Sequence, residues 1–234
     1  MSRFDGKKVF LTGAASGIGK ATHALFRSEG ADVVAVDIAE APDVRQCDIT
    51  DTAAVVDLVT GNGPFDIVLN VAGIVRLGHT TDVALADWDR QIAVNLTAPF
   101  AIIQAALPGL IERKGNIVNV GSIAGVKGQA YSAAYCASKG GVVMMTKGLA
   151  VEYARKGVRV NAVCPGMVWT PLVEGVAAEM REDFNEKLMS RAYNLLPPGT
   201  SQPDEIADAI AYLASDAAKS VTGAAFMIDG GIQC

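Results

Sequence analysis

Ser122, Tyr135 and Lys139 are the residues whose types and spacing first suggest chemistry. Tyr135 and Lys139 lie four positions apart in a segment whose apolar periodicity continues through Val142 and Met145. Residues at i and i+4 share one face of a helix, so the phenol and the ammonium should point the same way. A nearby cation lowers the pKa of a phenol, which is ordinarily about 10. The group therefore predicts proton transfer by Tyr135 near neutral pH.

A strand must end just before Ser122 for this group to assemble. Residues 115–120 read Gly-Asn-Ile-Val-Asn-Val, an apolar pattern that predicts a buried strand and places Ser122 at its end. Taken alone, Tyr-x-x-x-Lys is more often an amphipathic tyrosine with a surface lysine. The catalytic interpretation therefore depends on the rest of the chain.

A glycine-rich loop near the start of the chain predicts a nucleotide site. Residues 8–12 read as a short strand, followed by Gly13-Ala14-Ala15-Ser16-Gly17-Ile18-Gly19 and a helical pattern to Glu29. Glycines let the backbone approach a pyrophosphate, and the helix N-terminus offers free N–H groups. The glycine spacing fits neither the P-loop nor the G-x-G-x-x-G pattern. A glycine turn without a ligand is the alternative.

Asp37 favours a dinucleotide with a free ribose 2′-hydroxyl over one with a 2′-phosphate. It ends the next expected strand, residues 31–36. An acidic residue about 20 positions beyond such a loop binds a ribose 2′-hydroxyl and repels a 2′-phosphate. The sequence therefore predicts NAD as the cofactor.

The remaining pattern predicts an α/β fold with a doubly wound parallel sheet of about seven strands and helices on both faces. Further strands are expected at residues 44–49, 66–71, 157–163 and 224–228. Helices are expected at 51–59, about 85–113, and from 203 to about 213. Ligands of such sheets bind at the carboxyl ends of the strands. We expect residues 1–234 to form a single domain.

Composition excludes several classes of function. Hydrophobic residues make up 50% of the chain and charged residues 19%, which predicts a folded domain. The net charge of −5 argues against binding nucleic acid. Two histidines and four cysteines without a C-x-x-C pair suggest neither a metal site nor a disulfide framework. We expect a cytoplasmic protein with no membrane partner.

The ordered motifs resemble those of the short-chain dehydrogenase/reductase family, in its basic rather than its extended branch. They are Thr12-Gly13-x-x-x-Gly17-x-Gly19, Asn70-Val71-Ala72-Gly73, Ser122 and Tyr135-x-x-x-Lys139. The resemblance covers essentially the whole chain. It implies a Rossmann-type fold, an NAD-dependent enzyme that interconverts a secondary alcohol and its ketone, and a homotetramer.

The resemblance also implies roles for individual residues. Tyr135 would be the general acid/base, and Lys139 would lower its pKa and hold the nicotinamide ribose. Ser122 would hydrogen-bond the substrate oxygen. Asn95 would kink its helix and hold a relay water near the lysine.

Further residues are expected to contact the cofactor. Asp48 would meet the adenine amino group, and residues 165–170 would contact the nicotinamide carboxamide. Asn70 is expected mainly to tie neighbouring strands together. The complete predicted cofactor set is Gly13, Ser16, Gly17, Ile18, Gly19, Asp37, Asp48, Ile49, Asn70, Ala72, Gly73, Tyr135, Lys139, Pro165, Gly166, Val168 and Thr170.

A long connection at residues 172–200 is a candidate lid. Val176, Met180, Phe184 and Leu188 recur every four residues, which predicts a helix with one apolar face. That face would either pack on the core or cover the substrate.

Two other functions remain as alternatives. One is an NADPH-dependent 3-oxoacyl reductase of the same family; Asp37, and the lack of Arg or Lys at Ala15, Ser16 and Ile38, argue against it. The other is a nucleotide-binding sensor or scaffold without catalysis, because fold alone does not fix function.

Overall fold

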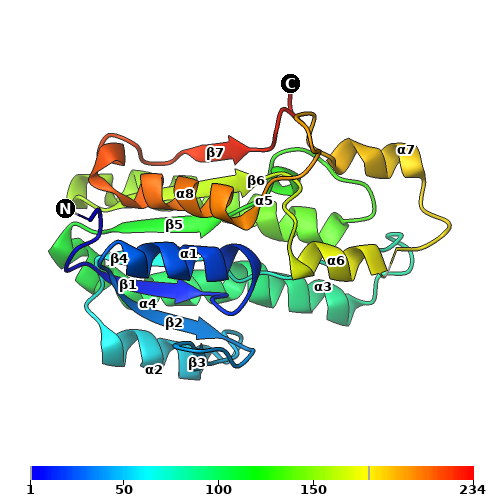
Figure 1. The fold of residues 1–234 in the computed structure, drawn as a ribbon. Coiled ribbons are helices and arrows are strands. Elements are labelled where there is room, and N and C mark those ends of the chain that lie inside the picture. Colours follow the sequence, from blue (N-terminus) through cyan, green and yellow to red (C-terminus); the bar gives the residue numbers. More distant parts are fainter. Residues whose placement is uncertain (1, 179) are drawn as a thin grey trace.

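Seven parallel strands form one sheet in the computed structural model, which describes residues 2–178 and 180–234 (Figure 1). The order across the sheet is β3-β2-β1-β4-β5-β6-β7. The strands are β1 (Lys8–Thr12), β2 (Asp32–Asp37), β3 (Arg45–Gln46), β4 (Ile67–Asn70), β5 (Asn116–Val120), β6 (Arg159–Pro165) and β7 (Ala225–Ile228). The predicted α/β fold with a parallel sheet is confirmed.

Helices cover both faces of this sheet. They are α1 (Gly17–Ser28), α2 (Thr52–Asn62), α3 (Leu85–Ile92), α4 (Ala98–Arg113), α5 (Ala133–Tyr153), α6 (Pro171–Ala178), α7 (Glu186–Met189) and α8 (Pro203–Ala214). Side chains of β1 alternate between the two layers, because successive residues of a strand point to opposite faces. Phe10 packs with the α2 and α4 side, whereas Val9 and Leu11 pack with α1 and α8.

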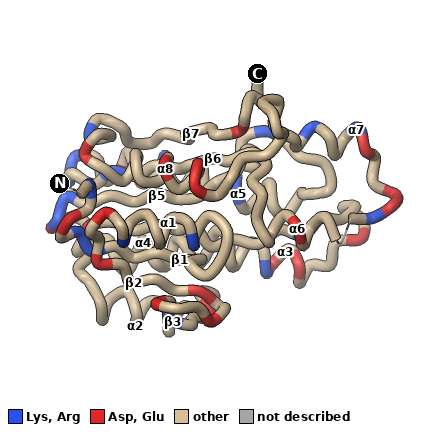
Figure 2. The backbone as a smooth tube through the Cα atoms, in the orientation of Figure 1, with Lys and Arg blue, Asp and Glu red and all other residues tan. Residues whose placement is uncertain are grey.

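Charged side chains lie around the outside of this arrangement. Figure 2 shows Lys and Arg interspersed with Asp and Glu on loops and helices, while the middle of the sheet is uncharged. Every residue of the central strands β4 and β5 is buried, and these strands are mostly apolar because both of their faces are covered.

Successive strands are added to one side of β1 and then to the other, since β1 pairs with β2 on one side and with β4 on the other. Parallel sheets bind ligands at such a switch point, beyond the carboxyl ends of the strands. The Thr12 hydroxyl at the end of β1 accepts hydrogen bonds from the backbone N–H groups of Val71 and Ala72, at 3.1 and 3.2 Å. These bonds hold the loop after β4 against the glycine loop.

Residues 85–113 form one long helix, as predicted, interrupted by a π-helical turn at Ala93–Thr97. By length and composition this helix could cross a membrane, but half of its most apolar window is buried inside the protein. Ile102 and Leu110 on its inner face are fully buried. It therefore packs as a core helix of the sheet.

Two sequence-based predictions need correction. The strand expected at 44–49 is reduced to Arg45–Gln46, because Cys47 and later residues turn toward α2. The continuous lid helix is wrong: α6 and α7 are separate, and residues 180–185 between them are not helical. Asn185 caps α7 by accepting a hydrogen bond from the Leu188 N–H, which starts a new helix there.

Candidate active site

Ser122 and Tyr135 line one cavity of about 180 Å³. Ser122 follows the end of β5, where its hydroxyl accepts a hydrogen bond from the Ala124 N–H at 3.1 Å. Tyr135 lies in the first turn of α5, which begins at Ala133. A strand end and a helix start therefore bring the two hydroxyls together as predicted.

Burial raises the pKa of the Tyr135 phenol, while hydrogen bonding with Ser122 acts in the opposite direction. The spacing of Tyr135 and Lys139 predicted a lowered pKa for the phenol, whereas burial raises this pKa in the protein alone. Lys139 Nζ lies 5.9 Å from the centre of the Tyr135 ring. At this distance the dominant influence on the phenol is its loss of water.

Lys139 is itself withdrawn from solvent, with 3% of its surface exposed. Among the described residues, its Nζ donates to the Val120 carbonyl at 2.8 Å. Burial lowers the pKa of Lys139 to about 8, because a desolvated ammonium is disfavoured. Near neutral pH Lys139 is therefore still mostly protonated, but it loses its proton about one pH unit higher.

Asn95 sits in the π-helical turn and is 1% exposed. Its Oδ1 accepts from the Ile74 N–H at 2.8 Å, and its Nδ2 donates to the Ile74 carbonyl and to Ser138 Oγ. The predicted distortion of the helix is thus present. The relay water expected at Asn95 stays a prediction.

Gly73 separates Asn95 from Lys139. A Cβ at this position would lie 3.2 Å from Lys139 Nζ and 3.3 Å from Asn95 Oδ1. A glycine therefore lets the loop after β4 pass close to both functional side chains.

A second cavity of about 310 Å³ lies beyond the ends of the strands and adjoins the first, since Leu172 lines both. Eleven predicted cofactor residues line it: Gly13, Ser16, Gly17, Ile18, Gly19, Asp37, Asp48, Ile49, Ala72, Gly73 and Thr170. We refer to this cavity as the nucleotide cleft.

The start of α1 in this cleft suits a phosphate group. Ser16 makes no capping hydrogen bond and the first turn holds no acidic residue, so its N–H groups and the positive helix dipole are available. Gly13 has a φ of +75°, and a Cβ there would lie 2.8 Å from the Ala72 backbone. Only glycine allows this close approach.

Asp37 is held at the end of β2 by the backbone. One carboxylate oxygen accepts from the Ala15 N–H at 2.9 Å and the other from the Ala39 N–H at 3.0 Å. A carboxylate has about four acceptor sites, so capacity for ribose hydroxyls remains. The residues of the cleft therefore fit a dinucleotide cofactor.

Arg90 also lines the nucleotide cleft and was not predicted from the sequence. Its guanidinium donates to Asp48 Oδ2 at 3.2 Å and to Thr50 Oγ1 at 2.9 Å. Burial raises the pKa of Asp48, but hydrogen bonds from Thr50 and Arg90 hold it below its ordinary value. The only sequence signal for Arg90 was its place on the helix that leads to Asn95.

Some predicted cofactor residues lie outside the lining of the cleft. The Asn70 amide donates to Asn119 Oδ1 at 2.9 Å, so it ties β4 to β5, as expected. Pro165 ends β6 and Val168 is buried in the core. Gly166 and Tyr135 line the neighbouring cavity instead.

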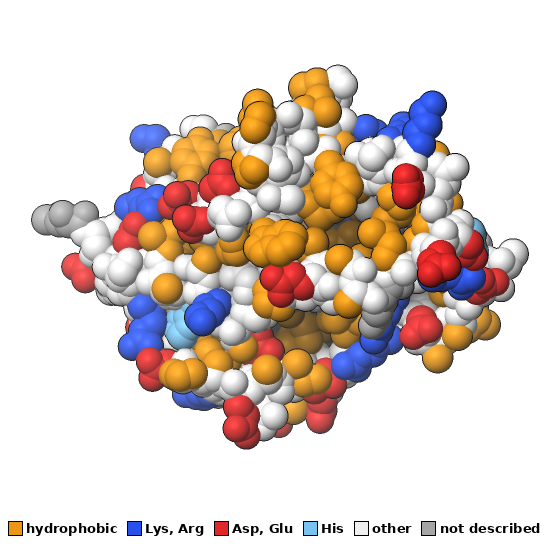
Figure 3. Space-filling model, turned by 45° about the vertical axis from the view of Figure 1, so that its right-hand side comes forward, with side chains coloured by type: hydrophobic (Ala, Val, Ile, Leu, Met, Phe, Trp, Pro, Cys, Tyr) orange, Lys and Arg blue, Asp and Glu red, His pale blue; other side chains and the backbone are white. Residues whose placement is uncertain are grey.

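Many of the residues that line that neighbouring cavity belong to the connection at 172–200, the candidate lid, among them Val176, Met180 and Tyr193. Val75, Leu77 and Gln129 were not identified from the sequence. Figure 3 shows a face that is hollowed near its centre, with hydrophobic side chains gathered there. Trp169 keeps 52% of its surface exposed, and such exposed apolar surface is typical of a ligand site.

Comparison with known proteins identifies the family. Residues 13–233 match the family described as enoyl-(acyl carrier protein) reductase. The chain is 39% identical over 251 residues to a 3-oxoacyl-[acyl-carrier-protein] reductase of Thermotoga maritima, covering 98% of this chain and 99% of that protein. The chain belongs to the short-chain dehydrogenase/reductase family.

Other members show how varied the family's substrates are. The chain is 40% identical over 250 residues to D-threitol dehydrogenase of Mycolicibacterium smegmatis, covering 98% and 94% of the two chains. The structure of carveol dehydrogenase from Mycobacterium avium in complex with NAD superposes with a TM-score of 0.90, at 27% identity and 99% coverage of each chain. Short-chain oxidoreductases of this kind act on small-molecule alcohols or ketones, so the chain is an oxidoreductase acting on CH–OH groups.

Proposed function

We propose that this protein is an NAD-dependent oxidoreductase that interconverts a secondary alcohol and its ketone. The observation that carries the proposal is the placement of Ser122 and Tyr135 in a cavity that adjoins the nucleotide cleft. Bound NAD would supply the hydride acceptor or donor. The protein supplies the proton transfer and the orientation of the substrate.

Tyr135 and Ser122 have distinct tasks in this proposal. The Ser122 hydroxyl hydrogen-bonds the substrate oxygen and orients it toward Tyr135. In alcohol oxidation the ionised Tyr135 oxygen accepts the hydroxyl proton, and in ketone reduction the neutral phenol returns one. Because burial raises the pKa of Tyr135, oxidation should be favoured at alkaline pH and reduction at neutral or lower pH.

Asp37 should make the enzyme prefer NADH to NADPH. Its carboxylate would repel a 2′-phosphate and accept the 2′-hydroxyl. Titration of each nucleotide by fluorescence should show tighter binding of NADH, and Asp37→Ser should reduce the difference. Asp43→Ser removes an exposed carboxylate elsewhere and should leave the preference intact. Equal or tighter binding of NADPH to the unmodified protein would contradict this assignment.

A 3-oxoacyl reductase that uses NADPH is the second candidate. The 39% identity to the Thermotoga maritima reductase favours it. Faster NADPH-dependent reduction of a 3-oxoacyl thioester than of any free ketone would establish it over the leading proposal.

We further propose a homotetramer in the cytoplasm. Met144 on α5 is 64% exposed and Phe100 on α4 is 47% exposed, and large exposed apolar side chains mark association surfaces. The four cysteines are unpaired, which fits a reducing compartment.

A further inference from the structure

We propose that the substrate is an uncharged, mainly apolar secondary alcohol or ketone of about the size of one substituted six-membered ring. The inference rests on the proposed oxidoreductase function and adds the chemical class of the substrate. It follows from the walls of the 180 Å³ cavity that holds Ser122 and Tyr135, here called the substrate cavity.

Among residues 2–178 and 180–234, which the structure describes, none that lines the substrate cavity has a charged side chain. Beyond Ser122 and Tyr135, its polar side chains are Gln129, Tyr193 and Thr200, all neutral. The apolar lining residues are Val75, Leu77, Ile123, Met167, Trp169, Leu172, Val173, Val176, Ala177, Met180, Met189 and Ala192. A carboxylate or phosphate placed here would lose water without gaining a cation, at a cost of several kcal/mol.

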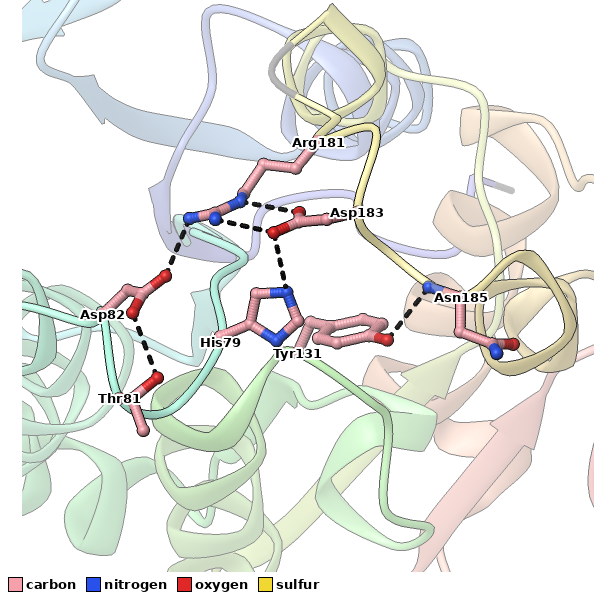
Figure 4. A network of polar contacts seen from close by, with 7 residues as sticks. All are labelled: His79, Thr81, Asp82, Tyr131, Arg181, Asp183 and Asn185. Carbon is pink, nitrogen blue, oxygen red and sulfur yellow. Dashed lines mark hydrogen bonds and ion pairs between the residues drawn. The ribbon is translucent and has the colours of Figure 1, made fainter.

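Arg181 and Asp183, which follow the lining residue Met180, are engaged with Asp82 and His79 of the loop at 79–82 (Figure 4). Arg181 donates to Asp82 at 3.0 Å and to both carboxylate oxygens of Asp183. His79 Nε2 lies 3.3 Å from Asp183. None of these four residues lines the substrate cavity. The connection after β6 therefore presents apolar side chains to the cavity. Its Arg181 and Asp183 contact the loop at 79–82 instead.

An aromatic cluster holds the same segment in place. The Phe184 ring stacks on Tyr131, with ring centres 4.1 Å apart, and His79 meets both rings edge-on. The Tyr131 hydroxyl accepts a hydrogen bond from the Asn185 N–H at 3.0 Å. Met180 and Met189, on either side of this anchor, both line the cavity. The apolar wall is thus fixed by contacts that lie outside the cavity.

Cations in neighbouring hollows are poorly placed to receive an anionic substrate. Lys127 and Arg191 line a hollow of about 40 Å³. Lys127 Nζ is engaged with the Ile232 carbonyl, to which it donates a hydrogen bond at 2.8 Å. Arg76 and Arg90 line a hollow on the other side of Leu172 and Val176, and Arg90 is paired with Asp48.

Cavity size and shape indicate a compact ring. A dry apolar cavity of about 150 Å³ binds benzene, so 180 Å³ accommodates a ring with a small substituent. Trp169 offers a flat apolar surface, and three methionines offer side chains that adapt to irregular shapes.

The test compares substrates that differ in one group. We expect kcat/KM for NAD-linked oxidation of 4-methylcyclohexanol to exceed that of 4-hydroxycyclohexanecarboxylate by at least about 100-fold, since the carboxylate loses hydration without a partner. The polyol D-threitol should also be slower, by about 10-fold or more, because apolar walls leave its extra hydroxyls unpaired. Equal or faster turnover of the carboxylate or of threitol would overturn the inference while supporting the oxidoreductase function.

Charge placed in the cavity should weaken the preference for the uncharged substrate. Met189→Lys keeps the length of the side chain and adds a cation to the lining. It should raise kcat/KM for the carboxylate relative to 4-methylcyclohexanol by about 10-fold or more. Leu188→Lys adds the same charge at the adjacent residue, which lines the other hollow, and should change this ratio little. Equal effects of both variants would overturn the assignment of the cavity.

A binding measurement separates this inference from the proposed function. Calorimetric titration of 4-methylcyclohexanone into protein saturated with NAD⁺, where reduction cannot occur, should show saturable binding. The carboxylate analogue 4-oxocyclohexanecarboxylate should not bind in the same range. Binding of the methyl ketone without turnover of any alcohol or ketone would preserve the substrate class and reject the proposed activity. Failure of the methyl ketone to bind would overturn the inference.

Discussion

Folding removes water from both Tyr135 and Lys139, and this loss sets their acid–base behaviour. The Lys139 ammonium is 3% exposed and lies 5.9 Å from the centre of the Tyr135 ring. The pKa of the phenol is raised by burial, and burial lowers the pKa of Lys139 to about 8. Both groups are therefore shifted toward their neutral forms.

Removal of the Tyr135 hydroxyl should abolish most activity. We expect Tyr135→Phe to lower kcat by about 10²–10⁴-fold, the usual contribution of a general acid/base. The ring and its packing remain, so the affinity for NADH should stay within about 3-fold of the original. Steady-state kinetics and a fluorescence titration measure the two effects. Retention of most activity at neutral pH would remove Tyr135 from the mechanism.

The buried charge of Lys139 should lower the free energy of unfolding at neutral pH. Its pKa falls from 10.5 to about 8 on burial, so between these values the unfolded chain binds more protons than the folded protein. Stability from this group therefore rises with pH from about 8 to 10.5 and is lowest below 8. Lys139→Met should be more stable than the original protein at pH 7, by on the order of 1 to 3 kcal/mol.

Urea unfolding of the protein without nucleotide, at pH 7 and pH 10, measures this effect. The advantage of Lys139→Met should shrink at pH 10, where Lys139 of the original protein is neutral when folded. Lys219→Met replaces an exposed lysine and should show no such change with pH. An advantage of the same size at both pH values would show that packing, and not the buried charge, is responsible.

At the scale of elements, two irregular segments position the site. The π-helical turn at Ala93–Thr97 points Asn95 at the backbone of Ile74. The segment after α6 is anchored by the stacking of Phe184 on Tyr131, although Tyr131 adopts a φ of +60°, a conformation disfavoured for a bulky side chain. The surrounding contacts must hold Tyr131 in this conformation.

Loss of the Phe184 ring should loosen the wall of the substrate cavity. We expect Phe184→Ala to raise KM for the alcohol by about 2- to 10-fold, since an aromatic pair contributes about 0.5–1.5 kcal/mol beyond its buried area. Tyr131→Phe keeps the ring stack and removes only the hydrogen bond to Asn185, so its effect should be smaller. The affinity for NADH should hardly change in either variant. An equal loss of NADH affinity in Phe184→Ala would indicate general unfolding instead.

At the scale of the whole molecule, the two longest helices present apolar side chains to solvent. Light scattering after size-exclusion chromatography should give the mass of four chains. Met144→Glu places a charge on the exposed face of α5 and should dissociate the assembly. Ile38→Glu makes the same kind of change at an exposed residue next to the nucleotide cleft and should leave the mass unchanged. A monomer in the original protein would contradict the proposed assembly.

The sequence by itself determined the order of the elements and the ends of the strands that carry function. The runs at 8–12 and 116–120 have apolar residues on both faces because central parallel strands are covered on both sides, and this pattern can be recognised in the sequence. The glycine loop, Asp37, Ser122 and Tyr135 were found because each has a local signature next to such a run. Helices from Pro203 and around Tyr135 were likewise predictable from local pattern and capping.

Only the tertiary structure decided how the site is solvated and what surrounds it. The shifts in the pKa values of Tyr135 and Lys139 arise from burial by distant segments, which a spacing of four residues does not encode. The every-fourth apolar pattern of the connection after β6 predicted one helix. Long-range contacts of Arg181 and Phe184 with residues about 50 to 100 positions away decided otherwise. The substrate cavity combines the stretch at 166–200 with residues 75–77 and 122–135, and only the fold brings these segments together.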